Sequence, residues 1–244
     1  MRKKPAGIDF NRKKVPEMVK ISRQIIKKHK GDKKAFKALG LKYAEKGGWE
    51  GAFLAGRLLF FTKDIISNNE FEKAIYKLGD DKSWEAREAA AGLTKELLPI
   101  DFDYFLNVLK KMVKDKNPNI RRLAVVGSMQ SKLSEKQATK VAQLIYRPLL
   151  NDENVYLRKN LGPFAVSQFL WLYPRAALAF FDNEMKTLKP RPVWNILNAF
   201  QTARLRANKD LITEAKKYLK AVADCQDKTI IAAATSLKRR LDSL

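Results

Sequence analysis

Apolar residues recur every three or four positions along most of the chain, in segments that end at Gly, Pro, Asp or Asn. This is the spacing of one buried helix face, and no segment shows the strict alternation of a half-buried strand. The pattern therefore predicts an all-α fold. The expected helices cover residues 15–30, followed by the first members of successive pairs at 33–46, 70–78, 101–113, 134–150, 174–188 and 209–223.

The second helix of each expected pair begins at a regular interval. The starts lie 34 to 37 residues apart, at Gly48, Ser83, Asn117, Glu153, Pro190 and Asp227. Three copies also carry an Asp six residues before an Arg, namely Asp81 and Arg87, Asp115 and Arg121, and Asp152 and Arg158. Both features are typical of HEAT-like repeats. We predict an α-solenoid of about six antiparallel helix pairs, whose second helices line a basic concave groove.

The charge of the chain indicates an anionic partner. The 49 Lys and Arg residues outnumber the 26 acids, which gives a formal charge of +23 at pH 7. A folded protein with this much self-repulsion most often binds nucleic acid or an anionic surface. We expect a basic arm over 1–14 and a single repeat domain over 15–244. No apolar run is long enough to span a membrane, and the basic N-terminus lacks the apolar segment of a secretory signal.

Single copies of cysteine and histidine exclude several kinds of chemistry. Cys225 has no intrachain partner, which favours a reducing, intracellular location. With His29 as the lone histidine, a His/Cys zinc site is excluded and a His-based triad is not expected. We therefore expect neither metal nor cofactor, and a monomer in the cytoplasm that associates with double-stranded DNA in the nucleoid rather than with a membrane.

The helix expected after Ser83 carries the candidate chemistry. A phase of 100° per residue places Trp84 and Glu88 one turn apart, on the side opposite the apolar stripe. The expected inward residues are Ala86, Ala89, Ala90, Leu93 and Leu97, and the outward ones are Trp84, Glu88, Ala91 and Lys95.

The next repeat is expected to add a guanidinium beside this pair. In the helix after Asn117, the expected inward residues are Ile120, Leu123, Val126 and Gly127, and the outward ones are Arg121, Val125, Ser128 and Lys132. In the structural alternative, Trp84 packs on the preceding helix, Glu88 is solvated and Arg121 pairs with Asp115.

Basic residues of the second helices are expected to line the concave side. They are candidates for phosphate contacts, which position a duplex without reading its sequence. The expected DNA-binding residues are Arg87, Arg122, Lys132, Arg158, Lys159, Arg204, Lys238, Arg239 and Arg240, with Trp194 as a further aromatic wall off its helix's stripe of Val193, Leu197 and Phe200.

The run Lys82-Ser83-Trp84 with Glu88, followed by Asp115 and Arg121, resembles the HEAT-like alkylpurine DNA glycosylases of the AlkC/AlkD superfamily. The resemblance covers the repeats from about Trp49 onward, and its distinctive motifs lie in three helices. Trp84, Glu88 and Arg121 match the Trp, acid and Arg of the AlkD branch. The segments from Asn117 to Gly127 and from Tyr156 to Lys159 are similar to segments of the AlkC branch.

The resemblance implies a monofunctional glycosylase for N3- or N7-alkylated purines in duplex DNA. Glu88 would stabilise the oxocarbenium-like sugar and position a water, Trp84 would hold the cationic nucleotide and Arg121 would anchor a phosphate. Two positions that are acidic in the AlkC branch are Val126 and Ser167 here, and Pro163-Phe164 stands near the second Trp of the AlkD branch.

Two other functions remain open from the sequence. One is a non-catalytic protein that binds bent, branched or damaged DNA. The other is an adaptor for an acidic protein, since HEAT-like arrays often bind proteins.

Overall fold

The computed structural model describes residues 14–202, 204–205 and 208–244, and the regular secondary structure in this part is entirely helical. The prediction of an all-α fold is confirmed. Apart from Lys14, the expected basic arm over 1–14 lies outside the described residues. The contacts group the chain into two compact units, Met1–Ala90 and Ala91–Leu244, and the single domain expected over 15–244 stays a prediction. The division falls inside one helix, α5 (Trp84–Leu97).

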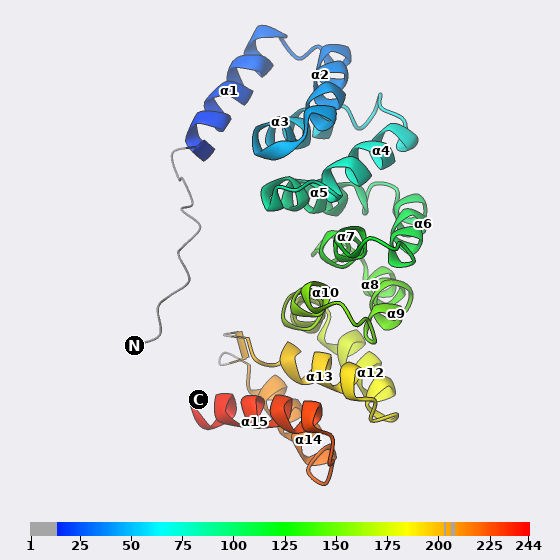
Figure 1. Cartoon of the computed structure of the whole chain (residues 1–244), viewed down its shortest axis with the longest axis vertical. Helices are drawn as coiled ribbons and strands as arrows, with labels where there is room; N and C mark the ends of the chain where they lie inside the picture. Colours follow the sequence, from blue (N-terminus) through cyan, green and yellow to red (C-terminus); the bar gives the residue numbers. More distant parts are fainter. Residues whose placement is uncertain (1–13, 203, 206–207) are drawn as a thin grey trace. The chain divides into compact units, whose positions relative to one another are not determined.

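The first unit is built of helices joined by short turns (Figure 1). Helix α3 packs against α1, α2 and α4, and α4 also packs against α2. The side chains buried at these contacts include Phe36, Leu58, Phe71 and Ile75. The helices are α1 (Lys14–Lys28), α2 (Lys33–Lys46), α3 (Gly48–Phe60), α4 (Asn68–Gly79) and the first half of α5.

Two glycines form the tight turn between α2 and α3. Gly47 and Gly48 have φ angles of 65° and 67°, a region that glycine enters without the steric cost of a Cβ. The Gly48 N–H donates a hydrogen bond to Asp81 Oδ2 at 2.9 Å. The same carboxylate accepts from the Ser83 N–H through Oδ1 at 2.7 Å. Asp81 therefore joins the α2–α3 turn to the α4–α5 turn.

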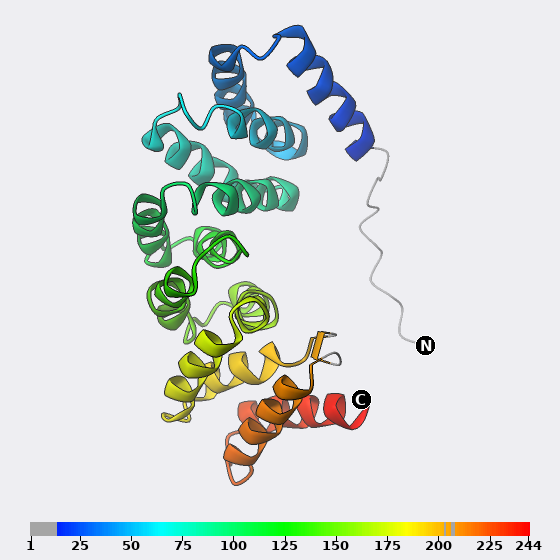
Figure 2. The same ribbon diagram turned by 180° about the vertical axis from the view of Figure 1, so that it is seen from behind.

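The second unit is also built of helical segments, in which the first and second helices of successive pairs alternate along the chain (Figures 1 and 2). Its second helices pack on one another in sequence, α7 on α10, η2 on α13 and α13 on α15. Within each unit this is the packing of an α-solenoid. The elements are α6 (Phe102–Val113), α7 (Pro118–Ser128), α8 (Glu135–Val141), the π-helix η1 (Ala142–Tyr146), α9 (Arg147–Leu149), α10 (Val155–Asn160), the π-helix η2 (Leu161–Val166), α11 (Ser167–Leu172), α12 (Pro174–Met185), α13 (Pro190–Ala199), α14 (Lys209–Ala221) and α15 (Lys228–Asp242).

Both π-helices occur beside a proline within a continuous helical segment. Pro163 lies inside η2, and Pro148 is the second residue after η1. A proline has no N–H to donate, and its ring collides with the carbonyl four residues earlier in an α-helix. A wider π turn relieves that collision. The helix is thus locally widened at Pro163, and α11 continues after it.

The predicted helix starts agree with the structure to within two residues. Polar side chains cap the starts as the sequence indicated: Asn117 accepts from the Asn119 N–H, and Asp227 accepts from the N–H groups of Thr229 and Ile230. The largest difference is in the fourth copy, where Asn154 rather than Glu153 precedes the helix. The observed second helices begin at Gly48, Trp84, Pro118, Val155, Pro190 and Lys228.

Candidate functional site

Helix α5 presents its apolar stripe nearly as predicted. The Ser83 hydroxyl accepts from the Ala86 N–H at 3.4 Å and donates to Glu85 Oε2 at 2.6 Å, so α5 begins at Trp84. Among the expected inward residues, Ala89 alone is half-buried. The buried ones are Ala86, Ala90, Leu93 and Leu97.

Trp84 and Glu88 lie off this stripe. Glu88 is exposed and Trp84 is half-buried, one helical turn apart in the first half of α5. The predicted pairing of an aromatic ring and a carboxylate on one face is therefore present within the first unit. Ala91 was predicted to face outward with them, and that prediction is wrong because Ala91 is only 1% exposed. Lys95, the last of the predicted outward residues, is half-buried.

Arg121 makes structural contacts, in contrast to its predicted role as a phosphate anchor. Its Nε donates to Asp152 Oδ2 at 2.7 Å, and its Nη2 donates to Asp152 Oδ1 at 3.3 Å. The two side chains are only 18% and 11% exposed. Nη1 also donates to the carbonyl oxygens of Asp115 and Lys116, at 2.9 and 3.0 Å. These four hydrogen bonds engage all three nitrogens of the guanidinium, so we assign Arg121 to the fold.

The same arrangement accounts for Arg87, which we had placed among the DNA-binding residues. Its Nη1 donates to the carbonyl oxygens of Asp81 and Lys82, at 2.7 and 3.0 Å. The spacing of Asp and Arg thus lets Arg87 and Arg121 reach back over the turns that begin their own helices, whereas Arg158 of the third copy forms no such hydrogen bond among the described residues. Carbonyl oxygens before a helix have no partner within the helix, and a guanidinium supplies several donors at once. In these two copies the motif stabilises the turn.

Helix α7 is buried on more sides than a single amphipathic stripe predicts. Val125 and Ser128 were expected to face outward, but both are fully buried, whereas Val126 is half-buried. The reason is that α7 packs against α6 on one side and against α10, η1 and η2 on others. The Ser128 hydroxyl lies within hydrogen-bond distance of the Val125 carbonyl (3.0 Å) and the Tyr146 hydroxyl (3.2 Å). Burial raises the pKa of Tyr146, which keeps this phenol neutral.

Arg122 also departs from its predicted place in the basic lining. It is only 6% exposed. Its Nε donates to Asn160 Oδ1 at 3.2 Å, and its guanidinium carbon lies 5.4 Å from the centre of the Tyr156 ring. These contacts join α7 to α10. A guanidinium held in this way is a packing residue, so we remove Arg122 from the phosphate-binding set.

The remaining predicted cations divide by exposure. Lys132 is exposed and pairs with Glu96 at 2.8 Å. Arg158 and Arg240 are half-buried, and the Nε of each is buried with no hydrogen-bond partner among the described residues. The other members of the predicted set that are exposed are Lys159, Arg204, Lys238 and Arg239.

Aromatic side chains in the second unit accompany some of these cations. Trp194 is half-buried and lies off the buried stripe of α13, as predicted. Phe164 is 65% exposed on η2. Trp171, which the sequence did not single out, is 37% exposed and carries Arg204 over its ring at 5.3 Å from the ring centre. The apolar run around Trp171 resembled a buried helix, so only its partial exposure marks it as a candidate.

Comparison of the chain with protein-family models, curated proteins and solved structures gave no significant match. Among the described residues, no three metal-ligating side chains come together. In that same part of the chain, every helix is too short or too polar to cross a bilayer.

Proposed function

We propose that this chain binds double-stranded DNA and excises alkylated purines from it. The observation that carries the proposal is the pair on α5, where half-buried Trp84 and exposed Glu88 stand one turn apart, off the buried stripe. An aromatic ring binds a cationic purine through its face. A carboxylate stabilises positive charge on the sugar. The formal charge of +23 supports an anionic polymer as the partner.

The proposed reaction needs only these residue types. An N3- or N7-alkylated purine is cationic, so the C1′–N bond breaks with its electron pair moving to the purine, without prior protonation. The Glu88 carboxylate faces the positive charge that develops on the sugar. It also accepts a hydrogen bond from the water that adds to C1′, and the water's proton passes to solvent or to this carboxylate. The products are a free alkylated base and an abasic site.

We do not propose phosphate contacts for Arg121, Arg87 and Arg122, because hydrogen bonds and packing within the fold hold these three side chains. The exposed cations of the predicted set take over that role. Contacts of this kind hold a duplex in register without reading its bases. The set that we now propose for phosphate contacts is Lys132, Lys159, Arg204 and Arg239.

The proposal is tested by measuring the release of 3-methyladenine and 7-methylguanine from methylated duplex DNA. We expect Glu88→Gln to retain duplex affinity and to lose base release by a factor of about 100 or more, the usual size of a positioned acid–base group. Glu50→Gln is the matched control. It removes the same charge from an exposed side chain of α3, in the same unit as Glu88. Equal release by wild type and Glu88→Gln would refute a role for this carboxylate.

A second candidate is a non-catalytic protein that grips bent, branched or damaged DNA. It is favoured by the engagement of Arg121 with Asp152, which removes one member of the triad implied by the resemblance. In that case wild type binds the duplex and releases no base. Tighter binding to a four-way junction than to a linear duplex of equal length would then identify the preferred substrate.

A further inference from the structure

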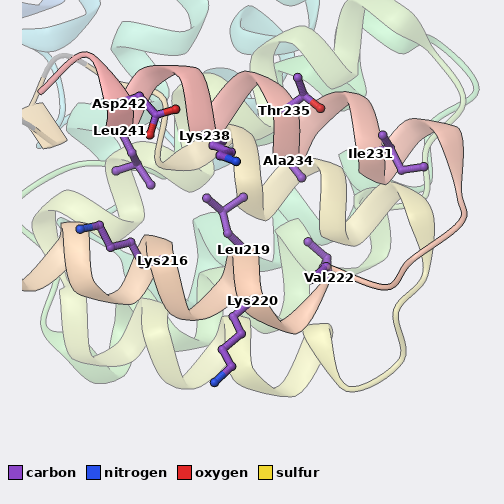
Figure 3. A pocket seen from close by; sticks show the side chains of 11 residues that line it. Lys216, Leu219, Lys220, Val222, Ile231, Ala234, Thr235, Lys238, Leu241 and Asp242 are labelled. Carbon is purple, nitrogen blue, oxygen red and sulfur yellow. The ribbon is translucent and has the colours of Figure 1, made fainter.

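A groove with an apolar floor runs between α14 and α15 (Figure 3). Its volume is about 540 Å³. Leu219 of α14, Val222 directly after α14 and Ile231 of α15 line it; Val222 is buried, whereas Ile231 is 44% exposed. Apolar side chains left open to water along a groove are characteristic of binding surfaces. The other lining residues are Lys216, Lys220, Ala223, Ala234, Thr235, Lys238, Leu241 and Asp242.

Helix α15 carries two apolar stripes, one packed inside the protein and one that faces α14 across the groove. Ile230, Ala233 and Leu237 are buried, and α15 packs on α13. A second stripe, with Ile231, Ala234 and Leu241, faces the groove at helical spacing. In the same unit α13 is in contact with α12, α14, α15 and η2. The second stripe of α15 thus has the periodicity that a further helix would match.

The charges around the groove are nearly all positive. Lys216 and Lys220 come from α14 and Lys238 from α15, where Figure 3 shows it above Leu219. Among the described residues, none of these three lysines forms an ion pair. The neighbouring Lys217, which does not line the groove, pairs with Asp182 at 3.2 Å and Glu214 at 3.3 Å. The rim therefore presents ammonium groups whose charge no acid of the described fold neutralises by direct contact.

We propose that this groove binds an acidic amphipathic helix of another protein. An amphipathic helix lays its apolar residues, spaced three and four apart, into such a groove, and acidic flanks would meet the rim lysines. A second copy of this chain is a poorer occupant, since an isologous contact through this face brings lysine rims together. The proposal does not depend on glycosylase activity, and it places Lys238 at a protein-binding surface rather than at DNA.

The test is fluorescence anisotropy of the whole chain with a labelled synthetic peptide as long as α15, which has 15 residues. Leucines stand at helical spacing in this probe and glutamates fill most other positions. A scrambled peptide of the same composition has no apolar face and controls for attraction to the basic surface. We expect the amphipathic peptide to bind at least about tenfold more tightly than the scrambled one.

Two variants locate the binding site. Ile231→Asp puts a charge on the apolar floor, and we expect about a tenfold loss of affinity or more. Because Ile231 is exposed, this change leaves the fold intact, which circular dichroism checks. Lys238→Glu should weaken binding severalfold. Arg239→Glu is the matched control: it makes the same charge change on the adjacent exposed residue, which does not line the groove.

Four results would overturn the proposal. They are no preference for the amphipathic peptide, equal losses in Lys238→Glu and Arg239→Glu, self-association of wild type that Ile231→Asp abolishes, and displacement of the peptide by duplex DNA with loss of DNA affinity in Lys238→Glu. The third result would assign the groove to a second copy of the chain. The fourth would return it to nucleic acid.

Discussion

Replacement of Arg121 by alanine separates a structural role from a phosphate-binding role. In wild type, the guanidinium donates to both oxygens of Asp152 and to the carbonyl oxygens of Asp115 and Lys116. Removing one partner of a buried ion pair costs about 3 to 5 kcal/mol, whereas an exposed pair contributes about 1 kcal/mol or less. With side chains 18% and 11% exposed, this pair is closer to the buried limit.

Two features moderate the expected loss. Asp152 keeps the hydrogen bond from the Asn154 N–H at 2.8 Å, and water can reach the freed carbonyl oxygens of the turn. We therefore expect Arg121→Ala to lower the free energy of unfolding by about 2 to 3 kcal/mol. For a unit of roughly 150 residues this corresponds to a fall in melting temperature of about 4 to 12 °C.

Thermal unfolding followed by far-ultraviolet circular dichroism measures the shift. Arg158→Ala is the matched control, since Arg158 occupies the same position in the next repeat but has no hydrogen-bond or ion-pair partner among the described residues. That variant should lose about 1 kcal/mol or less. An unchanged melting temperature in Arg121→Ala, together with a marked loss of duplex affinity, would refute the structural role.

Two further predictions concern packing and pH. Gly162→Ala should destabilise the protein by about 1 to 3 kcal/mol, because its Cβ would lie 2.8 Å from Asn195 Oδ1 and 3.1 Å from Asn195 Cα. Gly56→Ala should instead stabilise α3 by about 0.5 to 1 kcal/mol, because no atom lies within 4 Å of the new Cβ. Urea unfolding measures the free energy of unfolding of both variants. A change of the same sign in the two variants would contradict this description of the packing. A salt bridge from Lys37, with hydrogen bonds from Ser67, lowers the pKa of Glu70 from 4.5 to about 2. Because the folded pKa is below the unfolded one, the stabilisation is full above pH 4.5 and is lost as the pH falls towards about 2. The free energy of unfolding of wild type should exceed that of Glu70→Gln above pH 4.5, and the difference should vanish as the pH falls towards about 2. A difference that persists at about pH 2 would show that ionisation of Glu70 is not its source.

Local chemistry explains why the helix boundaries were predictable. Asn117 and Asp227 cap their helices through their own side chains, and Gly47 ends α2 with a positive φ angle. Such signals act over three or four residues, so they can be read from a single sequence. The π-helices were not predicted: the expected helix over 134–150 runs through Pro148 without a break, and a proline does not specify the wider turn that accommodates it.

The candidate site was only partly predictable, for physical reasons. The phase of α5 follows from its own residues, which placed Trp84 and Glu88 correctly off the buried stripe. The surroundings of α7 depend on helices that come later in the chain, so Val125 and Ser128 are buried although they lie opposite the expected stripe. Likewise, the partner of Arg121 is 31 residues away, and only the fold brings Asp152 to it.

The most direct test of the central claim is the affinity of wild type for an undamaged DNA duplex over a range of salt concentrations. The claim that exposed cations grip phosphates predicts that the logarithm of the binding constant falls linearly with the logarithm of salt concentration. Each phosphate contact contributes about −0.9 to the slope, so contacts by Lys132, Lys159, Arg204 and Arg239 predict a slope of about −3 to −4. A slope near zero, or no binding at low salt, would contradict both the glycosylase and the DNA-binding proposals and would favour an acidic protein as the partner.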